Sequence, residues 1–422
     1  MVTQAGIRVS TSPGPARLLS HVVPSGGIAT LRQHRQAYPH PHGADPDEVR
    51  TAAAASGLGG RGGAGFPIGR KLASVSELGG HIVVVNATEG EPASQKDRML
   101  LTSVPHLVLD GAELAARAVS ASQVVVCVDW TDRLAVAAVK AAIAERTARG
   151  EPEIQLALTP PRYVAGEESA LVNFLNGGPS KPTASGRRPY ERGVNGRPTL
   201  VNNAETLAQL TLAHRYGPEW FRSCGTPDEP GTRLFTITSG GGVATVVEAP
   251  VGVTGLDLLD AADAAGRVRS VLVGGYFGTW MRAADFGVAA FSRAGLAPYG
   301  AGPGAGIVIV LPHGNCVLAE TARLLSWYAA ESSGQCGPCV FGLPALAEVA
   351  AELARGTAGP AGVQQLLRWA ADIDGRGACR HPDGAVRLLR SALAVAGDDL
   401  DAHVAGQPCP GAEAAPFIRA AS

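Results

Sequence analysis

Short apolar runs that alternate with helical patterns are the feature that most restricts the fold of this chain. Runs as apolar as HIVVV and VVVCV are typical of strands buried on both faces, as in parallel sheets that are covered by helices. The strand-like runs and helical patterns of the first half are, in order, 81–85, 112–119, 123–128, 132–149, 154–158 and 167–175. This alternation predicts an α/β domain.

The pattern changes twice further along the chain. Short strands surround one helical pattern between 234 and 310, which predicts a small α+β domain. From Leu318 onward the sequence is helical and predicts a small bundle, with helices at 318–331, 343–355, 362–372 and 384–396. Residues 1–44 hold scattered Pro, Gly and His and are expected to be an irregular lead-in. The predicted divisions are 1–44, 45–232, 233–312 and 313–422.

Composition excludes several classes of protein. Of the 422 residues 45% are apolar and 17% charged, and the formal net charge is −1, so the chain lacks the basic surface that a nucleic-acid-binding protein needs. Its apolar runs are far shorter than the ~20 residues of a membrane helix. We find no secretory signal at the start of the chain. The expected protein is cytoplasmic, without direct membrane insertion.

A glycine-rich loop follows a helix that begins after Asp45 and ends at Gly57. Seven glycines lie between Gly57 and Gly69, and Gly60, Gly62 and Gly65 satisfy the pattern G-x-G-x-x-G. A helix precedes the loop, so the usual dinucleotide-binding context is missing. With Arg61 and Lys71, such a loop can still cradle a phosphate. The alternative is a flexible turn.

Two polar segments could contribute to the same site. The segment 86–98 follows a predicted strand, and sites in α/β sheets gather at the carboxyl ends of strands. The segment 162–170 places Glu167 and Glu168 in the first turn of a helix, where the helix dipole favours negative charge. A solvated charged turn and simple helix capping are the respective alternatives.

Four ordered motifs point to one family. SGLGGRGGAGFPIGRK, NATEGEP with KDR, YVAGEESAL and GRPTLVNNAET occur in an order and spacing that resemble the NADH- and FMN-binding flavoprotein subunit of respiratory complex I. The resemblance extends to relatives in soluble hydrogenases and formate dehydrogenases. It covers about residues 20 to 400.

The resemblance implies an α/β FMN-binding domain, a small β-grasp domain of the ubiquitin-like SLBB type, and a C-terminal helical bundle. It assigns FMN to the glycine loop, Lys71 and three asparagines. It assigns NADH to Phe66, Glu91, Glu167 and Glu168, with Arg187 and Tyr190 at the adenine. The implied cofactor-binding residues are Gly60, Arg61, Gly62, Gly63, Gly65, Phe66, Lys71, Asn86, Glu89, Glu91, Tyr163, Gly166, Glu167, Glu168, Arg187, Tyr190, Asn202 and Asn203.

The same resemblance implies an NADH dehydrogenase. Hydride would pass from NADH to FMN, and single electrons would then pass through an iron-sulfur cluster to an electron-accepting subunit or a ferredoxin-like carrier. Partner subunits would hold the chain at the inner face of the membrane. Thr88 departs from the family, which usually carries aspartate there, so flavin affinity or potential is expected to differ.

The segment 331–342 resembles the family's cluster motif with one change. Cys336 and Cys339 align with two ligands and Cys379 with the remote one, but Ser333 replaces a cysteine. Clusters are normally held by four thiolates. The outcomes left open are a [4Fe-4S] cluster with Ser333 or an exogenous ligand, a [3Fe-4S] cluster, a cluster that uses Cys409, or no cluster.

Other interpretations of the cysteines compete with these. A zinc site could combine the three cysteines with His381, and a disulfide could join Cys336 to Cys339, although a reducing cytosol disfavours it. Cys127, Cys224 and Cys316 lack partners at metal-like spacing and are expected to be packing residues. For the whole chain, the alternatives are a scaffold paralogue without electron transfer and a flavin-only diaphorase without the cluster.

Overall fold

The computed structural model describes residues 2–4, 7–11, 16–20, 27–38, 43–76, 81–146, 152–183, 187–239, 244–266 and 268–418. The chain divides into two compact units. The first comprises 1–90, 94–236 and 245–253, and the second comprises 91–93, 237–244 and 254–422.

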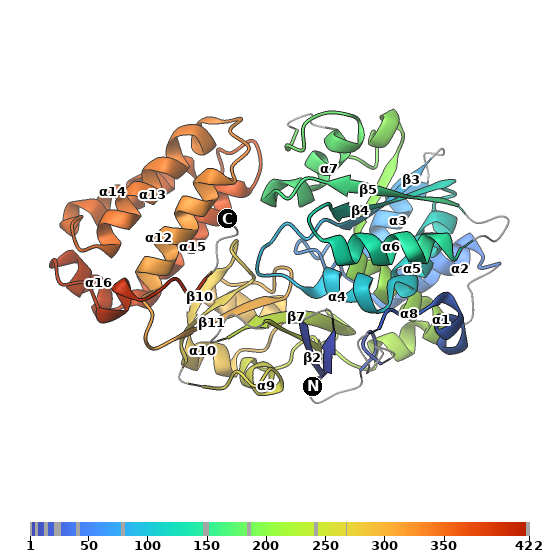
Figure 1. Ribbon diagram of the computed structural model, residues 1–422, viewed down its shortest axis with the longest axis horizontal. Coiled ribbons are helices and arrows are strands. Elements are labelled where there is room, and N and C mark those ends of the chain that lie inside the picture. The colour runs from blue at the N-terminus through green and yellow to red at the C-terminus, as the bar shows by residue number, and fades with distance from the viewer. Residues whose placement is uncertain are drawn as a thin grey trace. The chain divides into compact units, whose positions relative to one another are not determined.

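A four-stranded parallel sheet organises the first unit (Figure 1). Its order is β5-β4-β3-β6, formed by β3 (Ile82–Ala87), β4 (Gln123–Asp129), β5 (Glu153–Thr159) and β6 (Thr199–Asn203). The three predicted strands are confirmed within two residues at each end. The polar strand β6 was not predicted.

Alternate residues of the sheet pack against different helices. Val83 and Val85 face a core shared with α5 (Pro105–Ala118), α6 (Arg133–Ala144) and α8 (Ala204–Arg222), whereas Ile82 and Val84 pack with residues of α7 (Glu168–Leu175). Helices therefore cover both faces, as the apolar runs predict. A Cβ at Gly111 would lie 2.0 Å from the carbonyl oxygen of Leu207, so α5 and α8 approach closely only because this residue is glycine.

The remaining elements of the first unit include a second set of strands, in the order β1-β2-β8-β7. Strand β2 runs parallel to β8. The expectation that 1–44 is an irregular lead-in is wrong for the described part, which holds β1, β2 and α1. The bounds are β1 (Val2–Gln4), β2 (Ile7–Thr11), α1 (Leu31–Ala37), α2 (Pro46–Ser56), α3 (Ile68–Ser76), α4 (Lys96–Ser103), β7 (Thr232–Thr238) and β8 (Ala244–Pro250).

The second unit contains three antiparallel strands and a set of helices. Strand β9 (Val268–Val273) lies between β11 (Ile307–Pro312) and β10 (Thr279–Arg282). The short helices are α9 (Gly255–Ala261), α10 (Ala283–Val288) and α11 (Arg293–Leu296). The four helices predicted after Leu318 are present as α12 (Val317–Ala330), α13 (Leu343–Ala354), α14 (Gly359–Ile373) and α15 (His381–Ala396). The following helix, α16 (Asp398–Val404), was not predicted. No helix in the described ranges is both long and apolar enough to span a membrane.

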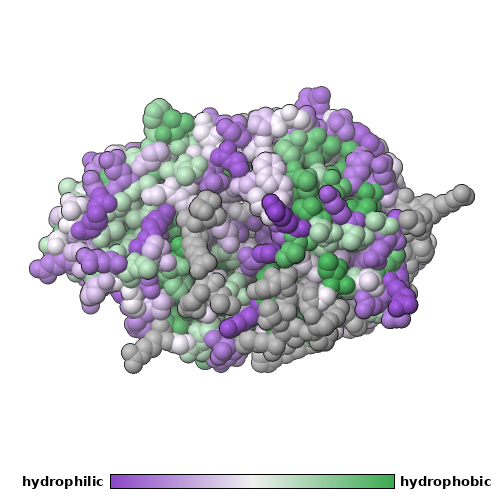
Figure 2. All heavy atoms as spheres, in the orientation of Figure 1, coloured by the Kyte–Doolittle hydropathy of each residue, from purple (hydrophilic) through white to green (hydrophobic). Residues whose placement is uncertain are grey.

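An apolar surface lies at one edge of the parallel sheet. Strand β5 is an edge strand of this sheet, and its residue Leu158 is exposed. Trp130, just before α6, and Leu134, in the first turn of α6, are exposed as well. Figure 2 shows hydrophobic side chains gathered over this part of the first unit.

A buried group of charges supports α5. Asp110 accepts hydrogen bonds from Arg35 and from Arg146 Nη2, the latter at 2.6 Å, and its carboxylate lies 2.8 Å from His34. Burial opposes the charge of Asp110, but His34 and Arg146 prevail and lower its pKa to about 2. Next to this group, His106 accepts a hydrogen bond from Arg146 through Nδ1 at 3.3 Å and is therefore neutral.

His106 makes stability depend on pH. Burial and then Arg146 lower its pKa to about 3 from the ordinary 6.5, so the folded protein binds fewer protons than the unfolded chain between these values. Stability should therefore fall as pH decreases below 6.5, by at most about 1.4 kcal/mol per pH unit from this group. Thermal unfolding of His106→Gln at pH 7, 6 and 5 should show a shallower loss than the wild type. The exposed His313→Gln is the control, and equal slopes for His106→Gln and the wild type would contradict the assignment.

Candidate functional site

The glycine loop closes on itself between α2 and α3. The amide of Gly60 donates to the carbonyl of Phe66 at 3.0 Å, and Gly59 pairs with Pro67 as an isolated bridge. Gly63 and Gly65 have φ of 113° and 60°, which glycine adopts without strain. The ring of Phe66 is 51% exposed and so is available for stacking. The loop therefore has a defined, hydrogen-bonded conformation.

The loop lies against the carboxyl end of β6 and the start of α8. A Cβ at Gly62 would lie 3.2 Å from Cβ of Asn203, and the amide of Arg61 donates to Thr206 Oγ1 at 2.8 Å. The guanidinium of Arg61 points into the protein, where Nη2 donates to the carbonyls of Pro230 and Thr232. The expectation that this cation faces an anion is therefore wrong, and only the backbone of Arg61 can serve the loop.

Three asparagines lie at the carboxyl ends of the neighbouring strands β3 and β6. Asn86 donates to the carbonyl of Gly166 at 2.8 Å and accepts from Thr88 Oγ1 at 2.8 Å. Asn203 donates to Asp97 Oδ2 at 2.6 Å and accepts from the amide of Glu205, so it caps α8. Asn202 differs, because its Nδ2 is buried and has no hydrogen-bond partner among the described residues. An unsatisfied buried donor is costly, so this amide is the one to which a ligand would contribute most.

The turn after β3 packs on the short helix η1 (Tyr163–Gly166). A Cβ at Gly166 would lie 2.9 Å from Thr88 Oγ1, and a Cβ at Gly90 would lie 3.0 Å from the carbonyl of Tyr163. Thr88 is buried and its hydroxyl donates to Asn86 Oδ1, so it helps to hold the Asn86 amide in place.

Two acidic residues at the start of α7 have different partners. Glu167 accepts from the amide of Ala170 at 2.9 Å and so caps the helix, as the capping interpretation expected. Glu168 accepts from Lys71 Nζ at 2.9 Å, and the same ammonium donates to the carbonyl of Val201 on β6. Lys71 therefore links the helix after the glycine loop to both α7 and β6.

Glu89 and Glu91 follow β3 and serve separate parts of the protein. Glu89 caps α4, since its Oε1 accepts from the amide of Asp97 and its Oε2 from that of Arg98. Burial and then the charge of Asp97 raise its pKa to about 7. Glu91 belongs to the second unit, where Oε2 accepts from the amide of Tyr276 at 3.1 Å.

Arg187 lines a cavity of about 450 Å³ in the first unit. Ser169 and Asn173 of α7 contribute to the wall, and Tyr190 lies nearby in sequence and is 36% exposed. A cationic and an aromatic side chain are thus both accessible, as the adenine assignment requires.

A buried ion group lies beneath the asparagines and was missed by the sequence analysis. Lys96 Nζ lies 2.8 Å from Asp97, 3.2 Å from Glu205 and 3.0 Å from Asn203 Oδ1. Although burial opposes its charge, Asp97 and Glu205 hold the pKa of Lys96 above its usual value. Lys96 and Asp97 belong to the KDR run and Glu205 to VNNAET. These charged residues within two of the motifs were the sequence signal that could have indicated the buried ion group.

The predicted cluster residues meet in the second unit. Ser333 and Cys339 are buried, and Cys336 and Cys379 are partly exposed. Burial, then the hydrogen bond and charge of Cys336 and the charge of Cys379, raise the pKa of Cys339 to about 11, while a hydrogen bond from Ser333 acts in the opposite sense. Cys336 and Ser333 are therefore hydrogen-bonding neighbours of Cys339, and Cys379, in the segment before α15, is near enough for its charge to act on Cys339.

Comparison with known proteins identifies the family. Residues 53–212 match the Nuo51 FMN-binding domain, and 319–403 match the NADH-ubiquinone oxidoreductase-F iron-sulfur binding region. The NADH-quinone oxidoreductase F subunit of Mycobacterium tuberculosis is 30% identical over 384 residues, which covers 86% of each chain. The chain belongs to the family of the NADH-quinone oxidoreductase F subunit.

Other relatives agree with this assignment. The NADH-quinone oxidoreductase F 2 subunit of Rhizobium meliloti is 29% identical over 410 residues, covering 93% of this chain and 96% of the relative. An NAD+-reducing [NiFe]-hydrogenase in the H2-reduced state aligns with a TM-score of 0.82 and 29% identity, over 96% of this chain and 68% of that one. The mixed α/β fold with its parallel sheet is thus that of this family.

His381, considered for a zinc site, and Cys409, considered for the cluster, have other neighbours here. The ring of His381 packs against Phe277 and Tyr328, and its Nε2 lies 2.9 Å from the carbonyl of Tyr328. The side chain of Cys409 lies beside Cys316 and His403. Cys316 and Cys127 are both buried, as expected of packing residues, but Cys316 also lies beside His403 and Cys409, which are distant from it in sequence.

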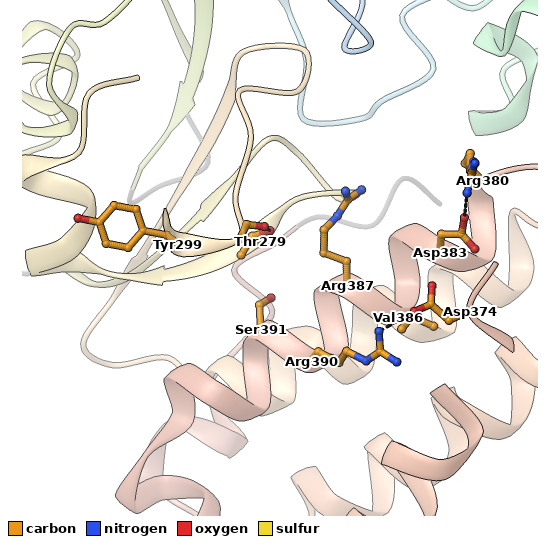
Figure 3. Close-up of a pocket in the computed structure, with 10 residues that line it drawn as sticks. Thr279, Tyr299, Asp374, Arg380, Asp383, Val386, Arg387, Arg390 and Ser391 are labelled. Carbon is orange, nitrogen blue, oxygen red and sulfur yellow. Dashed lines mark hydrogen bonds and ion pairs between the residues drawn. The ribbon is translucent and has the colours of Figure 1, made fainter. Parts of the chain in front are cut away.

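A separate cavity of about 740 Å³ lies beside α15 (Figure 3). Arg380 pairs with Asp383 at 2.9 Å and Arg390 pairs with Asp374 at 2.6 Å. Arg387 points away from α15 in Figure 3, and its Nε donates to the carbonyl of Phe277. Arg380 directly follows Cys379, so this cationic surface adjoins the cluster segment in sequence.

Proposed function

We propose that this chain is the NADH-oxidising subunit of an electron-transfer assembly. Its substrate is NADH, its flavin is FMN, and its electrons leave through an iron-sulfur cluster to a partner subunit or a ferredoxin-like carrier. FMN, when bound, accepts a hydride and returns electrons singly. The observation that carries the proposal is the ordered glycine loop beside the carboxyl ends of β3 and β6, where Asn202 keeps an unsatisfied buried amide.

The residues around the loop fit FMN. A Cβ at Gly60 would lie 3.4 Å from the carbonyl oxygen of Phe66 and one at Gly62 would lie 3.2 Å from Asn203, so these glycines let the loop pack closely on itself and on the end of β6. Asn202 Nδ2 can donate to an acceptor atom of the flavin. Lys71 supplies positive charge. Asn86 and Asn203 are engaged within the protein, so we assign them to holding the strand ends in place. No side chain is required to move a proton.

The residues proposed for NADH are those with exposed surface near the loop and α7. Phe66 offers an aromatic face, Arg187 a cation for a phosphate, and Tyr190 a ring for the adenine. We also assign Glu167, Glu168 and Tyr163 to the NADH site. Glu89 would act indirectly by fixing α4, and the assignment of Glu91 to NADH stays a prediction.

The donor set at 333–379 fits a cluster held by three cysteines. Cys336, Cys339 and Cys379 provide thiolates, and Ser333 provides an oxygen that can ligate only after it loses a proton. We propose a [4Fe-4S] cluster whose weakest ligand position is that of Ser333.

The finer organisation is also proposed. Strands β9 to β11 with α9 and α10 support a β-grasp domain at about 233–312, and α12 to α16 support a helical bundle at 313–422. All seven cysteines are free thiols, which suits a reducing compartment such as the cytoplasm. The relatives are named as subunits of larger enzymes, which supports the proposal that a partner subunit accepts the electrons.

The test is anaerobic purification with FMN and iron assays, followed by addition of NADH. Bleaching of the flavin absorbance supports the proposal, flavin without iron supports the diaphorase, and the absence of both supports the scaffold.

Asn202→Ala should weaken FMN binding about tenfold, the value of one lost hydrogen bond to a buried group. Arg187→Ala should raise KM for NADH several-fold with unchanged FMN content. An Asn202→Ala protein with wild-type FMN affinity would remove Asn202 from the site.

A further inference from the structure

We propose that Cys316, His403 and Cys409 form a zinc site distinct from the cluster. These residues come from the turn before α12, the last turn of α16 and the segment after it. Their ligand atoms all lie within 4.8 Å of one another. The proposed ligand is one divalent zinc ion, bound by two thiolates and one imidazole.

The distances suit a tetrahedral ion. His403 Nε2 lies 3.5 Å from Cys316 Sγ and 3.5 Å from Cys409 Sγ. Zinc bonds of about 2.3 Å to sulfur and about 2.0–2.1 Å to nitrogen place tetrahedral sulfur and nitrogen ligands about 3.6 Å apart. The side chains therefore need only small movements to bind the ion.

The surroundings orient the ligands. His403 is fully buried, and its Nδ1 lies 3.0 Å from the carbonyl of Leu353, to which it donates. That hydrogen bond leaves Nε2 as the acceptor, which is the usual arrangement of a metal-binding histidine. Nε2 now accepts from the amide of Cys409 at 3.2 Å, and the ion would replace this bond. Cys316 caps α12 and accepts from the amide of Ala319, a position that favours negative charge on sulfur.

The charge and coordination also suit zinc. Two thiolates balance a divalent ion, and Arg269, whose charge acts on Cys409, is paired with Asp399. No fourth His, Cys, Asp or Glu joins the group within the described residues, so the remaining position would go to water from the partly exposed side of Cys409. Such a three-ligand set is known for zinc.

The position would let the ion hold the C-terminal segment in place. A Cβ at Gly411 would lie 2.8 Å from the carbonyl carbon of Asn315, so the segment after Cys409 packs directly on the turn that holds Cys316. Glu320 of α12 accepts from the amides of Phe417 and Ile418 in the same segment. Zinc would fasten the C-terminal segment to α12 and α16.

The test is metal analysis of the complete holoprotein, purified anaerobically without chelators or metal-affinity resin. We expect about one zinc per chain in addition to iron, with an X-ray absorption spectrum of two sulfurs at about 2.3 Å and one nitrogen at about 2.0–2.1 Å among the zinc ligands. Cys409→Ala should lose at least fivefold in zinc and keep its iron, FMN and flavin bleaching by NADH. Cys409 is chosen because it is partly exposed, unlike His403.

Two controls separate this site from the cluster. Cys224→Ala, another partly exposed thiol, should keep its zinc, and Cys339→Ala should keep zinc while it loses iron. The proposal is overturned by wild-type protein with less than about one-fifth of a zinc per chain, by zinc retained in Cys409→Ala, or by a Cys316–Cys409 disulfide in the unreduced protein. None of these results would affect the flavin proposal.

Discussion

Replacing Lys96 with Met is expected to lower the free energy of unfolding by about 3–5 kcal/mol. The ammonium is almost fully buried, and its removal leaves Asp97 and Glu205 as unpaired buried charges, 2.8 Å and 3.2 Å from the vacated position. Asn203 also loses its hydrogen bond from Lys96, so the end of β6 should loosen and FMN content should fall with stability. Chemical denaturation and a flavin assay measure both effects.

Lys71→Met is the matched control for the stability measurement. Lys71 also pairs with a glutamate beside β6, but its side chain is 24% exposed and that of Glu168 is 37% exposed. Such pairs contribute about 0–1 kcal/mol. If Lys96→Met and Lys71→Met had equal free energies of unfolding, the buried ion group around Lys96 would not be what stabilises the site.

Cys339→Ala is expected to abolish the iron-sulfur cluster. Cys339 is buried, it interacts through hydrogen bonds with Cys336 and Ser333, and the charge of Cys379 acts on it. Iron and acid-labile sulfide should fall to near background, and the electron paramagnetic resonance signal after reduction should vanish. Flavin bleaching by NADH should persist, because the flavin residues lie on other elements. A protein that retained its cluster would show that ligation does not depend on Cys339.

The converse substitution strengthens the same site. Ser333→Cys supplies the fourth thiolate at a buried position, and cluster loss under a chelator should slow at least several-fold. Cys224→Ala should leave iron content unchanged. Equal cluster lifetimes in the wild type and Ser333→Cys would show that Ser333 is not at a ligand position.

The sequence by itself determined the regular elements. Apolar runs such as 81–85 and helical periodicities such as 343–355 depend on residues close together in the chain, so strands β3 to β5 and helices α12 to α15 were predictable. The glycine loop and the cysteine spacing were visible for the same reason. Strand β6 was missed because it is short and ends in two asparagines, and neighbouring β3 in the sheet specifies it more than its own residues do.

Only the tertiary structure decided how side chains are used. Arg61 has the sequence context of a phosphate ligand, yet the carbonyls of Pro230 and Thr232, some 170 residues away, bind its guanidinium. Lys96 pairs with Glu205, and Cys316 meets His403. Such partners are distant in sequence, and burial in a medium of low polarity obliges each charge or donor to find one. Local patterns carry no information about which partner folding will supply.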